Sequence, residues 1–114
     1  MDILSWNCRG ICNATTTRAL KDLISQTRPS IVFLCETKIS KKDDFTKLQR
    51  QLGLPNAAVV LSVGASGGLG LFWIDDVSLN VRDSSPRFID MEIGGGPGDP
   101  RWRLTWILWS SSDK

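Results

Sequence analysis

Two short, mainly apolar runs lie near the start of the chain, and each stops at a polar residue. The first covers residues 2–6 and stops at Asn7, and the second covers residues 31–35 and stops at Glu36. A continuous apolar run of this length indicates a strand that is buried on both faces. We therefore predict two core strands, each followed by a side chain that carries an oxygen ligand.

The stretch between these strands has the period of a helix. Its apolar residues recur at helical spacing over residues 17–26, and Pro29 follows shortly after them. A strand, a helix and a second strand of these lengths form a βαβ unit, in which the two strands run parallel. Because parallel strands end at the same edge of a sheet, we expect Asn7 and Glu36 to lie close together.

A second helix and five further strands are predicted downstream. The helix begins after Ser40, where residues 40–43 resemble a capping box, and it ends at Gly53. Its polar face carries four cations: Lys41, Lys42, Lys47 and Arg50. The strands are expected at residues 57–63, 69–74, 79–81, 89–93 and 101–109.

These elements predict an α/β chain with a mixed sheet of about seven strands and two helices. Residues 1–109 are expected to form one domain, and residues 110–114 a polar tail. No apolar run approaches the length of a membrane span, and no signal peptide is recognisable. We therefore expect a nuclear or cytoplasmic protein with no membrane partner.

The composition restricts the chemistry that the chain can perform. The 114 residues carry a net charge of only +2, include no histidine and no tyrosine, and contain three cysteines. The lack of histidine excludes Ser-His and Cys-His nucleophile pairs. Three cysteines alone do not complete a structural zinc site, and we expect them to be reduced. Catalysis would depend on carboxylates, lysine, cysteine or a metal ion.

Asn7 and Glu36 are the candidate catalytic and metal-binding residues. Amide and carboxylate oxygens are the hard ligands that Mg²⁺ prefers, and water and phosphate fill the remaining positions. Arg9 and Lys38 each follow two residues later and are the candidate nucleic-acid contacts. The alternative is a hydrogen-bonded structural pair that binds no metal.

Three blocks of the sequence carry a family resemblance. ILSWNCRG at residues 3–10, IVFLCETK at residues 31–38 and GGLGLFW at residues 67–73 resemble the endonuclease/exonuclease/phosphatase superfamily. The closest likeness is to the AP-endonuclease-like domain of plant LINE-type (non-LTR) retrotransposons, and it covers residues 1 to about 105. The resemblance implies a four-layer α/β sandwich that hydrolyses a DNA phosphodiester with Mg²⁺ or Mn²⁺ and so nicks the target site. It also implies that Glu36 is a metal ligand and that Asn7 lies near the metal and the phosphate.

The chain departs from this family in ways that bear on activity. Arg9 stands where some relatives carry an acidic residue, and the family's later Gly-Asp-Phe/Trp-Asn and Ser-Asp-His motifs are absent. We therefore expect the N-terminal half of the sandwich, truncated and inactive. Since half a sandwich would leave one sheet without its partner, Trp106 and Trp109 are expected to be exposed or to cause self-association.

Two other functions remain open at this stage. The chain could be a non-catalytic nucleic-acid-binding or interaction module that uses exposed strands or the basic face of residues 41–50. It could also be a phosphatase, because the same superfamily includes enzymes that act on small phosphate esters.

Overall fold

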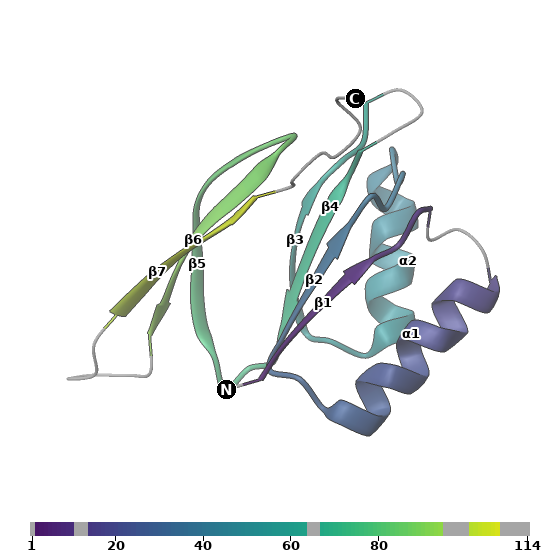
Figure 1. Ribbon diagram of the computed structural model, residues 1–114, viewed down its shortest axis with the longest axis horizontal. Coiled ribbons are helices and arrows are strands. Elements are labelled where there is room, and N and C mark those ends of the chain that lie inside the picture. The colour runs from purple at the N-terminus through teal and green to yellow at the C-terminus, as the bar shows by residue number, and fades with distance from the viewer. Residues whose placement is uncertain (1, 11–13, 64–66, 95–100, 108–114) are drawn as a thin grey trace.

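A computed structural model describes residues 2–10, 14–63, 67–94 and 101–107. These residues form seven strands and two helices (Figure 1). In chain order they are β1 (Ile3–Asn7), α1 (Ala14–Thr27), β2 (Ile31–Cys35), α2 (Lys42–Leu52), β3 (Asn56–Val60), β4 (Leu69–Trp73), β5 (Ser78–Ser85), β6 (Phe88–Gly94) and β7 (Arg101–Ile107).

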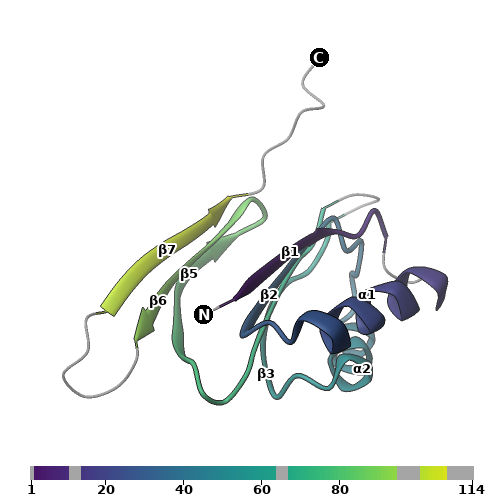
Figure 2. The ribbon, with the colours of Figure 1, turned by 60° about the horizontal axis from the view of Figure 1, so that its bottom comes forward.

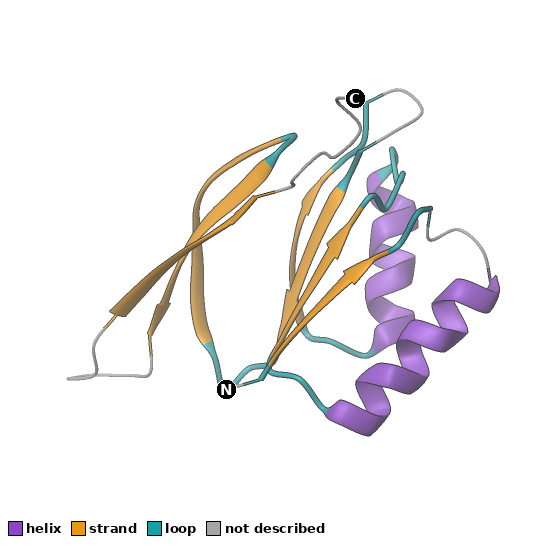
Figure 3. Ribbon diagram, viewed as in Figure 1, coloured by secondary structure: helices purple, strands orange, loops and turns teal. Residues whose placement is uncertain are grey.

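The first sheet contains the predicted βαβ unit. Its strand order is β1-β2-β4-β3, and β1 runs parallel to β2, as predicted. The register places Asn7 opposite Cys35. The predicted hairpin of β3 and β4 is also present. Both helices cover one face of this sheet (Figure 3). The side chains between them are apolar and buried, and include Leu20, Val32, Leu34, Phe45, Leu48 and Phe72.

A second, antiparallel sheet of order β5-β6-β7 packs on the other face. The seven strands therefore form two sheets, and every residue of β2 from Ile31 to Leu34 is buried because the strand is covered on both faces. Ile31 and Phe33 face the second sheet, where they join Ile89 and Met91 in one apolar cluster. Figure 2 shows the two sheets side by side, with the helices on the far side of the first.

The expectation that one sheet lacks its partner is wrong for this part of the chain. The ring of Trp106 stacks on Phe33 with 4.2 Å between the ring centroids and 10° between the planes. Trp106 is thus partly buried between the sheets rather than exposed, whereas Trp102 is 68% exposed at the other end of β7. Trp109 lies outside the described residues.

The outer face of the second sheet carries several charged side chains. The Asp90 carboxylate accepts a hydrogen bond of 2.6 Å from Arg103 Nη2 and another from the Thr105 hydroxyl. These donors hold the pKa of Asp90 below its usual range, with the Arg103 hydrogen bond as the largest cause. Beside them Arg82 pairs with Glu92 at 2.8 Å. Paired charges therefore occupy the face that a fourth layer would cover.

The predicted helix bounds need two corrections. Helix α1 begins at Ala14, three residues earlier than predicted, because polar residues at its start contribute no apolar period. The capping box is wrong: Lys41 is the N-cap of α2, and no side chain caps it. The predicted end is confirmed, since Gly53 has a φ of 72° and its N–H donates to the carbonyls of Gln49 and Arg50.

Candidate functional site

The carboxyl ends of β1 and β2 meet at one edge of the first sheet. Beyond the strands the pairing continues, because the Cys8 N–H donates to the Cys35 carbonyl at 2.9 Å and the Gly10 N–H donates to the Glu36 carbonyl at 2.8 Å. Asn7 and Glu36 therefore lie on adjacent, hydrogen-bonded segments, as the βαβ unit predicts.

The backbone at this edge is unusual. Glu36, Lys38 and Arg9 have φ values of 53°, 57° and 49°, and Arg28 is the one other non-glycine residue with positive φ in the described part of the chain. Each left-handed residue of this kind costs about 1–2 kcal/mol and persists only where its surroundings impose it. Such strain concentrates at functional sites, so this edge is a candidate site on backbone grounds alone.

The four predicted site residues all lie here. The Asn7 Oδ1 atom accepts a hydrogen bond of 3.1 Å from the Arg9 N–H, which leaves its second lone pair available. The Glu36 side chain is partly buried, and Arg9 and Lys38 are exposed. Gly10 lies against the stem of Lys38, since a Cβ added at Gly10 would be 3.4 Å from Lys38 Cδ. The two loops are thus in contact, and the roles of these residues stay predictions.

The residues at this edge fit a divalent-metal site that other ligands complete, and not a site in which these residues supply every ligand. Within the described ranges no group of three or more His, Cys, Asp or Glu side chains is placed to hold a metal ion. Asn7 and Glu36 together supply two oxygen ligands, and Mg²⁺ is usually bound through one or two carboxylates with water and phosphate completing the octahedron. A metal here would depend on ligands from water, substrate or another part of a longer domain.

Two thiols border this edge. Burial, together with the smaller effects of the neighbouring Cys35 and Glu36 charges, raises the pKa of Cys8 to about 12. Burial and Glu36 also raise the pKa of the Cys35 thiol, which lies 3.8 Å from the Trp6 carbonyl. Cys8 and Cys35 are free, as predicted, and both are protonated near neutral pH. Cys12 is outside the described residues.

These raised pKa values predict a specific dependence on pH. In a Cys12→Ser background, Cys8 should resist a thiol reagent at pH 8 in the native state and react at once in urea. Because the folded pKa of Cys8 exceeds the unfolded value, the free energy of unfolding should fall as pH rises from 9.0 toward about 12. Denaturant titrations should show this fall reduced by Cys8→Ala. Native labelling as fast as unfolded labelling would contradict the burial of Cys8.

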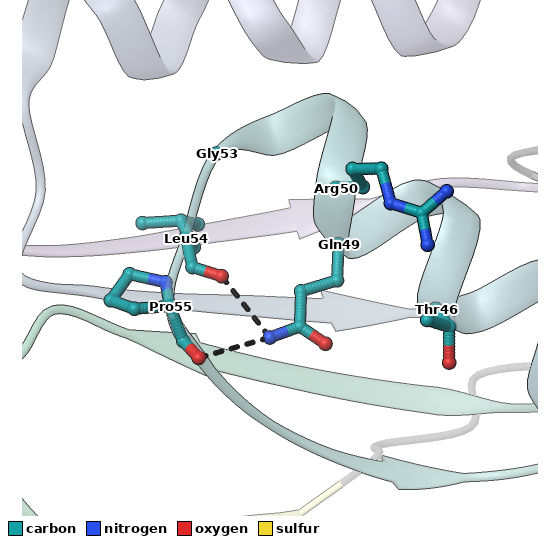
Figure 4. Close-up of a pocket in the computed structure, with 6 residues that line it drawn as sticks. All are labelled: Thr46, Gln49, Arg50, Gly53, Leu54 and Pro55. Carbon is teal, nitrogen blue, oxygen red and sulfur yellow. Dashed lines mark hydrogen bonds between the residues drawn. The ribbon is translucent and has the colours of Figure 1, made fainter.

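A shallow pocket of about 290 Å³ lies elsewhere, at the C-terminal end of α2. Thr46, Gln49, Arg50, Gly53, Leu54 and Pro55 line it (Figure 4). The Gln49 side-chain amide donates to the carbonyls of Leu54 and Pro55 at 3.1 and 3.2 Å, so it holds the turn after the helix. Helix α2 runs back from the Glu36 edge, which places this pocket at the opposite end of the sheet (Figure 1).

One buried contact beside the site has no signal in the sequence. Thr37, between Glu36 and Lys38, is fully buried and lies directly against Gly68. A threonine that follows a strand is ordinarily a solvated turn residue, so only the fold reveals this contact.

No protein-family model matches the chain, and no curated protein does. Solved structures do match. The AP endonuclease of Leishmania major is 14% identical, with a TM-score of 0.68 over 96% of this chain and 40% of its own. TDP2 of Caenorhabditis elegans is 15% identical, with a TM-score of 0.68 over 99% and 36%. The 3′ phosphatase NExo from Neisseria, bound to a product DNA hairpin, is 17% identical, with a TM-score of 0.61 over 94% and 41%.

At these identities the likeness concerns the fold alone. The chain spans about two-fifths of the length of each of these proteins. None of the helices in the described part of the chain is long and apolar enough to cross a membrane. The architecture predicted from the three sequence blocks is confirmed: the chain has the α/β fold of the endonuclease/exonuclease/phosphatase proteins.

Proposed function

We propose that this chain is the N-terminal half of a Mg²⁺- or Mn²⁺-dependent DNA endonuclease domain from a plant LINE-type retrotransposon, and that alone it does not cleave DNA. The observation that carries the proposal is the meeting of Asn7 and Glu36 at a strained edge of the first sheet. The similar structures support it, because one is an AP endonuclease and another holds a DNA product.

The residues at this edge suit part of a phosphodiesterase site. The Glu36 carboxylate would bind the divalent ion, and the Asn7 amide would orient a phosphate or water beside it. Arg9 and Lys38 are exposed cations on the same loops and would contact DNA phosphates. A bound divalent ion would supply charge neutralisation and activation of water. The chain has no histidine, and its described residues form no group of three or more Cys, Asp or Glu side chains that could hold a metal ion.

The proposed truncation rests on the length of the chain relative to the similar structures and on the edge strands of its two sheets. This chain aligns with only 36–41% of the three structures, although 94–99% of it is covered. Among the described residues, β1 and β7 are edge strands that are paired on one side only, and Ile3 and Trp102 on them are 47% and 68% exposed. Such edges can accept further strands, either from the remainder of a longer domain or by self-association.

Plasmid nicking tests the proposed lack of activity. The purified chain in Mg²⁺ should nick supercoiled DNA no faster than it does in EDTA, and no faster than Glu36→Gln. Mg²⁺-dependent nicking that Glu36→Gln abolishes would show a complete enzyme and contradict the truncation. DNA binding that falls with salt and survives EDTA would instead favour a non-catalytic binding module. The basic face of α2 does not by itself favour that module, because Asp43 and Asp44 are exposed in its first turn.

A further inference from the structure

Thr37 and Gly68 form a tight contact beside the candidate site. Thr37 is fully buried, and its Oγ1 accepts a hydrogen bond of 3.3 Å from the Ile39 N–H. A Cβ added at Gly68 would overlap Thr37 Oγ1 and would lie 3.1 Å from the Lys38 nitrogen. No side chain at Gly68 is therefore compatible with the present position of Thr37.

Hydrogen bonds extend this contact along the backbone. The Thr37 N–H donates to the Gly68 carbonyl at 3.2 Å, and the Lys38 N–H donates to the Gly67 carbonyl at 2.9 Å. Gly67 and Gly68 have φ values of 91° and 94°, a conformation that glycine adopts without cost. The glycine pair thus prolongs the pairing of β2 with β4 beyond the ends of both strands.

Glu36 is held from the other side as well. Its carbonyl accepts the Gly10 N–H at 2.8 Å, and directly after Lys38 the Ser62 N–H donates to the Ile39 carbonyl at 2.8 Å. Glu36 and Lys38 are left-handed, whereas Thr37 between them is the residue buried against Gly68. Contacts on both sides of Thr37, together with its own contact with Gly68, therefore oppose relaxation of Glu36.

We propose that Thr37 and Gly68 are positioning residues, which hold Glu36 in its left-handed conformation at the edge it shares with Asn7. This inference rests on the proposed function, because it gives the contact between Thr37 and Gly68 a role in binding a divalent ion. Positioning groups of this kind act through the ligand that they orient, and losing one typically weakens metal binding by about 10–100-fold.

A matched pair of glycine variants tests whether the contact between Thr37 and Gly68 positions Glu36. Gly67→Ala and Gly68→Ala both place alanine at a positive φ, but a Cβ at Gly67 meets nothing within 4 Å. Only Gly68→Ala should displace Thr37. We expect amide hydrogen exchange at Thr37 and Lys38 to be about tenfold faster in Gly68→Ala than in Gly67→Ala, and Mn²⁺ affinity to fall by about 10–100-fold more. Equal effects of the two variants would overturn the proposal.

Threonine variants keep the test decisive if Gly68→Ala does not fold. Thr37→Ser retains the acceptor for the Ile39 N–H and should keep the wild-type exchange rates and Mn²⁺ affinity. Thr37→Val keeps the shape of the threonine side chain but loses the acceptor, so exchange should be faster and Mn²⁺ affinity lower. Thr46→Val, at an exposed position on α2, is the control and should change neither. Equal exchange rates and equal Mn²⁺ affinities of Thr37→Ser and Thr37→Val would refute the positioning role of Thr37. Absence of Mn²⁺ binding in the wild type would refute the proposed function instead, while the exchange comparison would still decide whether Thr37 and Gly68 hold Glu36.

Discussion

Replacing Phe33 by alanine is expected to lower the free energy of unfolding by about 3–5 kcal/mol. Phe33 is fully buried between the two sheets, and its ring stacks on Trp106. The substitution removes this apolar surface and leaves a cavity that two sheets, each fixed by its own hydrogen bonds, cannot close. Because a domain of this size has a total stability of about 5–15 kcal/mol, Phe33→Ala should be at or near the limit of folding.

Urea denaturation followed by circular dichroism measures this loss. Trp102→Ala is the control, since it removes an even larger aromatic ring from β7, at a site that is 68% exposed. Surface substitutions usually change stability by about 0.5 kcal/mol or less. If Phe33→Ala were no more destabilising than Trp102→Ala, the two sheets would not pack as described.

The second large effect is expected for metal binding by Glu36→Gln. A ligand that binds only the native state stabilises it by about 2.7 kcal/mol at a hundredfold excess over its dissociation constant. Wild-type protein should therefore show a rise in melting temperature as Mg²⁺ or Mn²⁺ is added. Glu36→Gln keeps the shape of the side chain but removes the negative charge that binds the ion, so the rise should disappear.

A charge-matched control separates the site from general screening. Asp44→Asn removes one exposed negative charge from the first turn of α2, at a residue that is not a predicted metal ligand. Its response to Mg²⁺ should equal that of the wild type. If Glu36→Gln and Asp44→Asn both kept the wild-type response, the ion would bind elsewhere or act only by screening.

The sheet edge that carries the site can be predicted from the sequence because the patterns that indicate it are local. A five-residue apolar run between Pro29 and Glu36 permits a buried strand and little else, and β2 has the predicted bounds. The short helical crossover then requires β1 to run parallel to β2, which brings Asn7 next to Cys35. Two local signals and one topological rule are sufficient to place Asn7 beside Glu36.

Long-range packing was not readable in the same way. Alternating apolar residues in β6 and β7 indicate that one face is buried, but not that β2 covers it, so Trp106 was expected to be exposed. The left-handed conformation of Glu36 has no signal in the sequence either, because it is imposed through Thr37 by Gly68, which lies directly before β4. The predicted capping box failed for a simpler reason: Lys41, and not Ser40, is the N-cap residue.

The most direct test of the central claim is a Mg²⁺ titration of the wild-type chain followed by backbone amide NMR. A divalent site at the Asn7–Glu36 edge predicts saturable shifts for the amides of residues 7–10 and 36–38. The amides of Gln49, Arg50 and Gly53, around the pocket at the opposite end of the sheet, should not move. Shifts confined to other residues, or weak shifts spread over all carboxylates without saturation, would contradict the assignment of this edge as a metal site.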